Sequence, residues 1–159
     1  MAVIGIISNA NNIIEKENKI KKELNEKNII VINEVALDNI KNIKFDIIVI
    51  YEEMKRTEKV KEIIKESKYI ILNTDFKENI NLLDENIEGM VITIGYNSKS
   101  TITIISNENE EIILEIQREI KGLFGEKIDC QEIKLKNKSE KNNIYEEISM
   151  KILAILLKI

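Results

Sequence analysis

The chain has 159 residues, a length that fits one domain with a single hydrophobic core. Its 28 acidic and 24 basic residues give a net charge of −4 and are mixed along the chain without a basic block, which argues against nucleic-acid binding. The sequence has no histidine, and Cys130 is its one cysteine. These counts exclude zinc clusters of Cys and His, histidine-based catalytic triads and internal disulfides.

The first half of the chain alternates β-branched apolar runs with charged amphipathic segments, a pattern typical of a parallel sheet built from βαβ units. Strands are predicted at residues 3–7, 29–32, 45–51, 69–72 and 90–94. Helices are predicted at residues 11–27, 57–67 and 77–84. In the first helix, we expect Ile13, Ile14, Ile20 and Leu24 to pack one face on the sheet.

The pattern changes after Gly95. Residues 101–106 and 111–117 alternate apolar and polar side chains on either side of a polar stretch, and residues 132–136 alternate again. This alternation predicts a small antiparallel hairpin or three-stranded flap, and a C-terminal helix is predicted from residue 143 onward. No repeat, low-complexity tract or Pro/Gly linker marks a boundary, so residues 1–159 are expected to form one domain.

The two ends of the chain show no pattern of a secretory or membrane segment. Met1 leads straight into apolar residues, without a basic region or a cleavage site of small residues. The apolar stretch at residues 148–159 is interrupted by Lys151 and Lys158 and is too short to span a bilayer. The expected location is the cytoplasm.

The turn after the first predicted strand carries the first of four family resemblances. Its sequence, VIGIISNANNII at residues 3–14, has the strand, turn and helix of the phosphate loop VIGITGTNGKTT, and it resembles that loop in the central ATP-binding domain of the Mur ligases. The resemblance puts Ser8 and Asn11 at loop glycines, Asn12 at the phosphate-binding lysine and Ile13 at the hydroxyl that binds magnesium. Because Asn and Ile supply neither charge nor metal ligand, we expect a degenerate phosphate-binding loop.

The second stretch, VINEVALDNIKNIKFDIIVI at residues 31–50, resembles a family segment in which a strand ends in a magnesium-binding glutamate, here Glu34. An ordinary loop acid is the alternative interpretation of Glu34. Residues 51–54 correspond to the family's TNxxxDH turn and keep neither its Asn nor its His. Lys61 lies where several family members carry a carbamylated lysine, but Lys59 and Lys65 fit equally well, and a solvated helical face is the alternative.

The third stretch comprises residues 69–75, YIILNTD, and residues 90–106, which are similar to the family's NxDD turn and its ITYGFN strand and flap. It implies that Asn73 and Asp75 are vestigial ligand contacts at the carboxyl edge of the sheet. The alternative is a capped strand-to-helix turn in which Asp75 accepts backbone N–H bonds.

The fourth stretch, residues 141–159, resembles the family's HNVYNALAAIAAAL helix. It retains Asn143, Ile144 and Tyr145 in phase, whereas Glu146 replaces an Asn that reads adenine in the family. Together the four stretches imply a three-layer, open, mostly parallel α/β sheet of the P-loop NTPase-like kind, with a small antiparallel flap and a C-terminal helix. The resemblance does not extend to the family's N-terminal UDP-binding domain or to its C-terminal substrate domain.

The resemblance suggests a non-catalytic binding or interaction module linked to cell-wall or related peptide-ligase metabolism, with no catalytic residue, metal or cofactor. A first alternative is a subunit of an ATP-dependent ligase that a partner chain completes. Such a subunit binds a nucleotide or UDP-sugar, if only weakly, through Glu34, Asn73, Asp75 and Asn143. A second alternative is a structural homo-oligomer that uses exposed sheet edges and the C-terminal helix.

Overall fold

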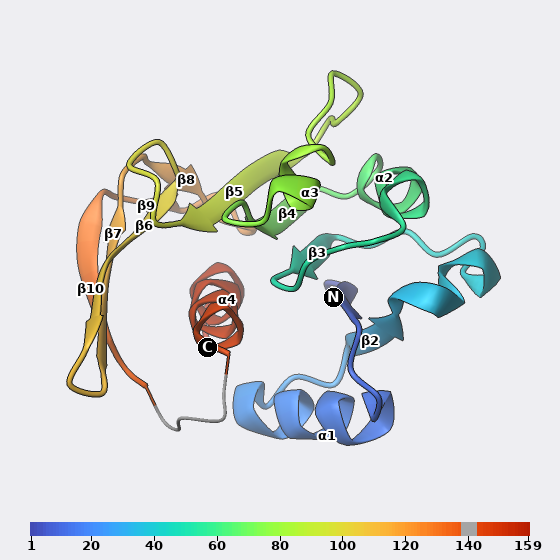
Figure 1. The fold of residues 1–159 in the computed structure, drawn as a ribbon, viewed down its shortest axis with the longest axis horizontal. Coiled ribbons are helices and arrows are strands. Elements are labelled where there is room, and N and C mark those ends of the chain that lie inside the picture. Colours follow the sequence, from blue (N-terminus) through green and yellow to red (C-terminus); the bar gives the residue numbers. More distant parts are fainter. Residues whose placement is uncertain (138–142) are drawn as a thin grey trace. The chain divides into compact units, whose positions relative to one another are not determined.

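The computed structural model describes residues 1–137 and 143–159, and it divides into two compact units at residues 1–91 and 92–159. We call these unit 1 and unit 2. Each unit combines strands with helices, as the labels in Figure 1 show, and the predicted α/β class is confirmed. The expectation that residues 1–159 form one domain stays a prediction.

Unit 1 is built on four parallel strands in the order β2-β1-β3-β4. Their bounds are β1 (Ile4–Ser8), β2 (Ile29–Asn33), β3 (Ile47–Ile50) and β4 (Tyr69–Asn73). All side chains of β1, β3 and β4 are buried, as expected of central parallel strands. A Cβ at Gly5 would lie 2.6 Å from Cδ1 of Ile48 and 2.9 Å from the ring of Phe45, so the missing side chain makes room for both.

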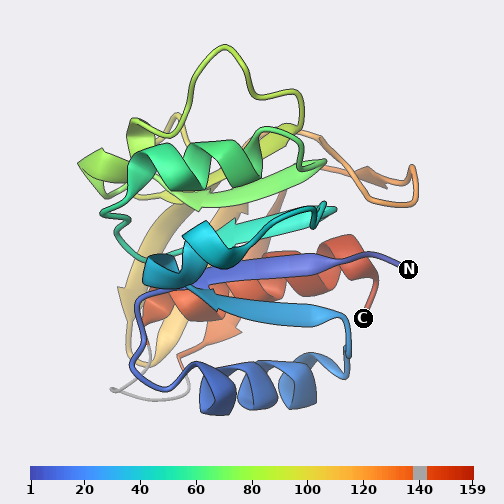
Figure 2. The same cartoon turned by 90° about the vertical axis from the view of Figure 1, so that its right-hand side faces the viewer.

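Unit 1 has four helical segments, of which the first three connect its strands and the fourth follows β4. They are α1 (Ile13–Leu24), the 3-10 helix η1 (Glu34–Asn39), α2 (Thr57–Ile64) and the single turn α3 (Lys77–Ile80). Helix α1 lies beside β2 (Figure 2) and buries Ile20 completely, whereas Ile14 is 76% exposed. The predicted packing of Ile14 on the sheet is therefore wrong, because a period of 3.6 residues groups Ile20 with Ile13 and turns Ile14 by about 100°.

A hydrophobic core of unit 1 lies between the strands and the segments η1 and α2. The helical spacing of Val60, Ile63 and Ile64 predicts that all three are buried; Val60 and Ile64 are buried, and Ile63 is partly buried against this core. The fully or almost fully buried members of this core are Ile7, Ile32, Leu37, Phe45, Ile48, Ile50, Met54, Val60, Ile64, Ile70, Leu72 and Leu82. This aliphatic layer holds the carboxyl ends of the strands in fixed register.

Asp46 connects the amino ends of three strands in unit 1. Its Oδ2 accepts a hydrogen bond from the N–H of Val3 at 2.9 Å, and its Oδ1 accepts one from Nζ of Lys68 at 2.6 Å. The Lys68 bond lowers the pKa of the Asp46 carboxyl; burial opposes this, and the Val3 bond reinforces it. A carboxyl whose pKa is lowered in the folded state adds stability above its unfolded pKa, and this stability is lost as pH falls through the folded pKa.

We expect Asp46→Asn to lower the free energy of unfolding by about 1 kcal/mol near neutral pH, since the exposed Lys68 ammonium is screened by solvent. The difference from the wild type should shrink below about pH 4, where the carboxyl becomes protonated. Urea unfolding across this pH range measures both effects. Asp129→Asn, at an exposed site, is the control, and parallel pH curves for Asp46→Asn and the wild type would contradict the prediction.

Unit 2 contains the predicted antiparallel flap. Its strands β6 (Ile102–Glu108), β7 (Glu111–Ile116) and β10 (Gln131–Lys136) pair in the order β6-β7-β10, all antiparallel. Strand β5 (Met90–Gly95), which belongs to unit 2 from Ile92 onward, pairs with β6 in parallel. The three-stranded flap is confirmed, and this parallel pairing is an addition to it.

A two-stranded hairpin of unit 2 has no counterpart in the predicted elements. It consists of β8 (Ile120–Lys121) and β9 (Lys127–Ile128). Gly125 in its turn has φ +86°, a left-handed conformation that glycine adopts without strain. Two residues per strand are too few for an alternating pattern to be visible in the sequence.

The predicted C-terminal helix is α4 (Ile144–Leu157) in unit 2. Asn143 caps its start by accepting the N–H of Tyr145, and the left-handed Lys158 ends it. Nζ of Lys158 lies 5.5 Å from the centre of the Phe124 ring, a cation–π contact. Residues 141–142, which open the fourth family-like stretch, lie outside the described residues. Among the described residues, none of the helices has the length and apolar character needed to cross a membrane.

Candidate functional site

Polar side chains gather where the parallel strands of unit 1 end. Ser8 closes β1, Asn33 closes β2, Glu52 follows β3 and Asn73 closes β4. Ligands of open α/β sheets bind at this end of the strands. We call the segments 8–16, 33–34, 51–56 and 73–79 the carboxyl edge and treat it as the candidate site.

The turn after β1 is bound to the carboxylate of Glu52. The buried hydroxyl of Ser8 donates to Oε1 of Glu52 at 2.9 Å, and the backbone N–H of Asn9 donates to Oε2 at 2.5 Å. Nζ of Lys16 in α1 lies 3.0 Å from Oε1 and 4.9 Å from the centre of the Tyr51 ring. We call Ser8, Asn9, Lys16, Tyr51 and Glu52 the Glu52 cluster. It links the ends of β1 and β3 to the second turn of α1.

The other predicted loop residues serve the start of α1. Asn11 and Asn12 are exposed. The Oδ1 of Asn12 accepts the N–H of Glu15 at 3.1 Å, and its Nδ2 donates to Oε2 of Glu15 at 2.8 Å. Asn12 is thus the N-cap of the helix that starts with the apolar Ile13. At the positions that the resemblance matches to a lysine and a hydroxyl residue, a neutral amide begins a helix.

Glu34 is buried, with 2% of its surface exposed, and therefore is not an ordinary loop acid. Its Oε1 accepts hydrogen bonds from the backbone N–H of Lys55 at 2.5 Å and of Arg56. Arg56 is the N-cap residue of α2 and makes no capping bond with its own side chain. The carboxylate of Glu34 thus holds the two backbone N–H groups that lead into α2, the second of them 22 residues away, and its negative charge suits the positive end of the helix.

Asn73 and Asn79 form a buried amide pair between the ends of β3 and β4. Nδ2 of Asn73 donates to the carbonyl oxygen of Tyr51 at 3.0 Å. Nδ2 of Asn79 donates to the carbonyl oxygens of Glu52 at 2.9 Å and Asn73 at 3.0 Å, and its Oδ1 accepts the N–H of Met54 at 2.9 Å. These bonds satisfy the backbone of the turn after β3, where no sheet partner is available.

The remaining predicted contacts lie in two different units. Asp75 is exposed in unit 1, and its backbone N–H donates to Oδ1 of Asn73 at 3.0 Å. In this strand-to-helix turn, the side chain of Asn73 is therefore the acceptor of a backbone N–H bond. Asn143 caps α4 in unit 2. Asn73 and Asp75 thus lie in one turn after β4, while Glu34 lies before the start of α2. Groups of three or more Cys, Asp or Glu side chains that suit a metal ion are not found among the described residues.

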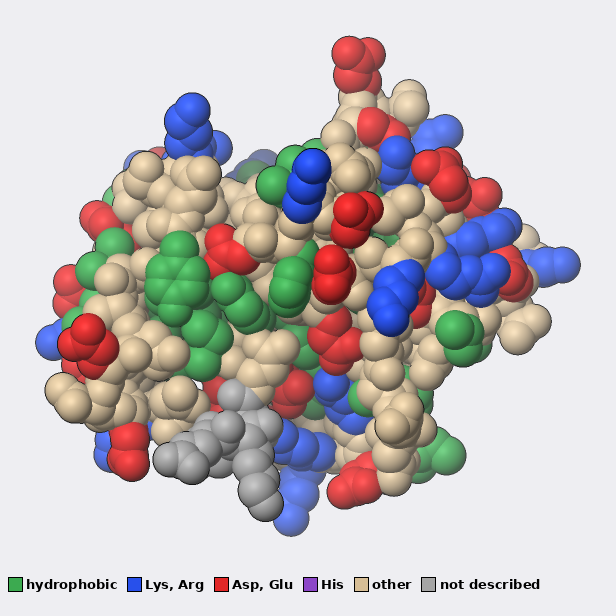
Figure 3. Space-filling view, in the orientation of Figure 1, with side chains coloured by type: hydrophobic (Ala, Val, Ile, Leu, Met, Phe, Trp, Pro, Cys, Tyr) green, Lys and Arg blue, Asp and Glu red, His purple; other side chains and the backbone are tan. Residues whose placement is uncertain are grey.

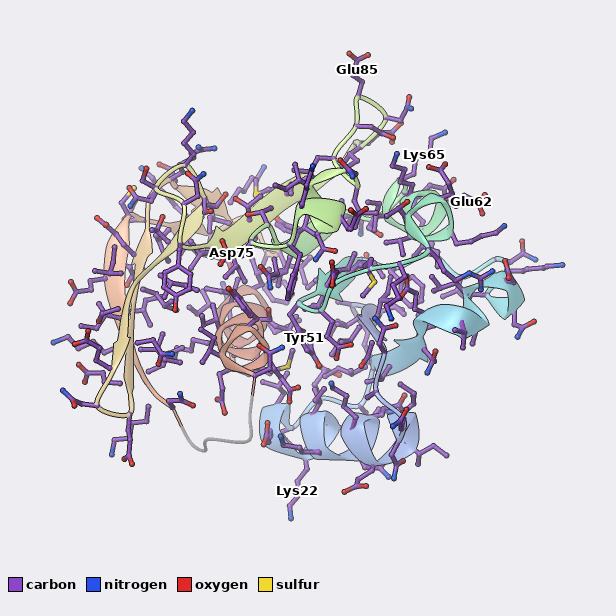
Figure 4. All side chains as sticks on the ribbon, in the orientation of Figure 1. Lys22, Tyr51, Glu62, Lys65, Asp75 and Glu85 are labelled. Atoms are coloured by element: carbon purple, nitrogen blue, oxygen red, sulfur yellow. The ribbon has the colours of Figure 1, made fainter. Side chains whose placement is uncertain are left out.

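Helix α2 presents a charged outer face. Lys61 lies 3.6 Å from the carboxylate of Glu58, and Lys59 lies 3.5 Å from that of Glu62. Figure 4 shows Glu62 and Lys65 on the outer side of this helix, and Figure 3 shows acidic and basic side chains interspersed over it. This arrangement supports the solvated-face interpretation of Lys61.

A surface pocket of about 370 Å³ lies beside α2 in unit 1. Its lining comes from η1, from the loop before β3 and from α2 and consists of Leu37, Ile40, Asn42, Ile43, Lys44, Lys59, Glu62, Ile63 and Glu66. None of these residues belongs to the carboxyl edge. The pocket is therefore separate from Glu34, Asn73, Asp75 and Asn143, although Lys59, one of the three lysines considered for the carbamylated position, lines it.

Sequence reasoning missed Glu52 and Asn79. Glu52 is one of two adjacent acids in a turn, and Asn79 is one of many asparagines in the chain. A weak signal existed for Asn79, since it follows Asn73 by six residues in a segment otherwise typical of a short helix. For Glu52 the signal is its place directly after the apolar run of β3, where side chains reach the carboxyl edge.

Neither a scan against models of protein families nor a search of curated proteins finds a match for the sequence. Similar solved structures include a pseudomurein peptide ligase type C from Methanothermus fervidus, with a TM-score of 0.62 and 15% identity over 99% of this chain. They also include MurF from Acinetobacter baumannii, with a TM-score of 0.59 and 10% identity over 100% of this chain. The chain spans 47% and 43% of those two proteins. Its fold is therefore one that both of these ligases contain within a part of their length.

Proposed function

We propose that the chain is a Mur-ligase-like domain without a working phosphate-binding loop, which serves as a binding or interaction module in cell-wall or related peptide-ligase metabolism. One observation carries this proposal. At the carboxyl edge, the side chains that match family ligand contacts are bonded to the chain's own backbone: Asn12 caps α1, Glu34 binds the backbone that leads into α2, and Asn73 holds the turn after β3.

Phosphoryl transfer needs groups that these residues do not provide. Enzymes of this kind neutralise the phosphate charge with lysine or arginine and with magnesium held by hydroxyl and carboxylate ligands. Asn12 is neutral, Ile13 is apolar, and Oε1 of Glu34 already accepts two backbone N–H groups. A magnesium ion would have to compete with both of these bonds, whose loss would leave the N–H groups of Lys55 and Arg56 without this acceptor. The same polar groups thus stabilise the fold instead of binding a nucleotide.

Calorimetry with ATP, ADP and a UDP-sugar, each with magnesium, tests the proposal on the intact chain. We expect no binding up to about 1 mM nucleotide and no release of phosphate from ATP. Magnesium-dependent binding in the micromolar range, or ATP turnover, would overturn it. Such a result would instead favour the residual nucleotide-binding subunit. Asp75→Ala, a change of an exposed side chain, then shows whether binding uses this edge of unit 1.

A further inference from the structure

The Glu52 carboxylate accepts hydrogen bonds from three donors of different kinds. They are the hydroxyl of Ser8 at 2.9 Å, the backbone N–H of Asn9 at 2.5 Å and the ammonium of Lys16 at 3.0 Å. The three donors come from the end of β1, the following turn and α1, whereas Glu52 comes from the turn after β3. Both oxygens of the carboxylate are engaged, so the contact is more than a single surface ion pair.

The pair of charges in this cluster is largely removed from water. The side chains of Lys16 and Glu52 are 15% and 19% exposed, and the hydroxyl-bearing Ser8 is fully buried. In such surroundings the ammonium requires a nearby negative charge, because an unpaired charge at a shielded site is costly. The chain provides this charge itself. Hydroxyl, backbone N–H and ammonium together are also the donors with which proteins hold phosphate oxygens.

We propose that Glu52 is a built-in anion that closes the turn between β1 and α1 to phosphate groups from solution. This inference rests on the proposed function, because it gives the physical reason why the turn binds no nucleotide phosphate. A free phosphate must displace a carboxylate that is attached to the same domain and held in place by β3. The intramolecular competitor has a high effective concentration at all times, so millimolar phosphate does not replace it.

Inorganic pyrophosphate is the probe that tests the closure. Glu52→Ala removes the carboxylate and frees its space, and Glu52→Gln keeps the space filled but removes the charge. Glu53→Gln is the matched control, because it removes the neighbouring exposed acid from the same turn and leaves the Glu52 cluster intact. Thermal unfolding of the full chain is followed with and without about 5 mM pyrophosphate, against sodium chloride of equal ionic strength.

We expect pyrophosphate to raise the unfolding midpoint of Glu52→Ala by about 2–4 °C and that of Glu52→Gln by less, with no shift in the wild type or in Glu53→Gln. An equal shift in the wild type would overturn the proposal, because the turn would then be open. The absence of a shift in both Glu52 variants would also overturn it. If Glu52→Ala does not fold, the shift of the unfolding midpoint of Glu52→Gln by pyrophosphate decides the test. Failure here leaves the wild-type test with ATP and ADP unaffected, so the two proposals are separable.

Discussion

Replacing Asn79 by alanine is expected to lower the free energy of unfolding by about 3–5 kcal/mol, since two buried backbone groups and one partly buried backbone group lose their partners at once. These groups are the N–H of Met54 and the carbonyl oxygens of Glu52 and Asn73. Asn79 is fully buried, so water does not reach these groups without opening the turn. Each unpaired buried group costs about 1–3 kcal/mol.

Urea denaturation at neutral pH measures the effect of this substitution. Asn81→Ala is the matched control, because it removes the same side chain from an exposed position at the end of α3. We expect it to change the free energy of unfolding by less than about 0.5 kcal/mol. Similar losses for the two variants would show that the amide pair does not hold the turn after β3.

Replacing Glu34 by alanine is expected to lower the free energy of unfolding by about 2–4 kcal/mol, because the N–H groups of Lys55 and Arg56 lose their buried acceptor. Glu34→Gln keeps an acceptor oxygen and should lose less. The charge also interacts with the positive end of α2, a contribution that the glutamine removes. The free energy of unfolding is therefore expected to decrease in the order wild type, Glu34→Gln, Glu34→Ala.

Magnesium separates this structural role from metal binding. If Glu34 serves only to bind the N–H groups of Lys55 and Arg56, magnesium chloride shifts the midpoint of thermal unfolding of the wild type no more than that of Glu34→Ala. A stabilisation by magnesium that appears only in the wild type would identify Glu34 as a metal ligand. Asp38→Ala is the control, since it removes a half-exposed acid of η1 that pairs with the side chains of Arg56 and Lys59 and leaves the bonds of Glu34 to the backbone in place.

The strands were predictable from the sequence for a physical reason. Parallel strands buried on both faces need continuous apolar runs, and the run at residues 45–51 stands out from its charged surroundings. The segments η1, β8 and β9 were missed because they are short and depend on contacts formed elsewhere in the fold. Ile14 was assigned to the wrong face, although its neighbour Ile13 fits the periodic pattern.

The positions of the candidate site residues could be predicted from the sequence, but their hydrogen-bond partners could not. From the sequence, Ser8, Glu34 and Asn73 were expected at or just after strand ends, and in the structure Ser8 closes β1, Glu34 directly follows β2 and Asn73 closes β4. It gave no sign that Glu52 bonds to Ser8 across 44 residues. Such pairings follow from the order of strands in the sheet, and a single sequence carries no record of that order.

The amide pair of Asn73 and Asn79 bears on how related sequences are to be compared. Both asparagines are fixed by hydrogen bonds to the main chain of the neighbouring turn. Selection for a folded protein alone would then retain an asparagine at the end of β4 and a second one six residues later, even in descendants that had lost every ligand. Shared asparagines at this edge report common architecture, and they are poor markers of shared chemistry.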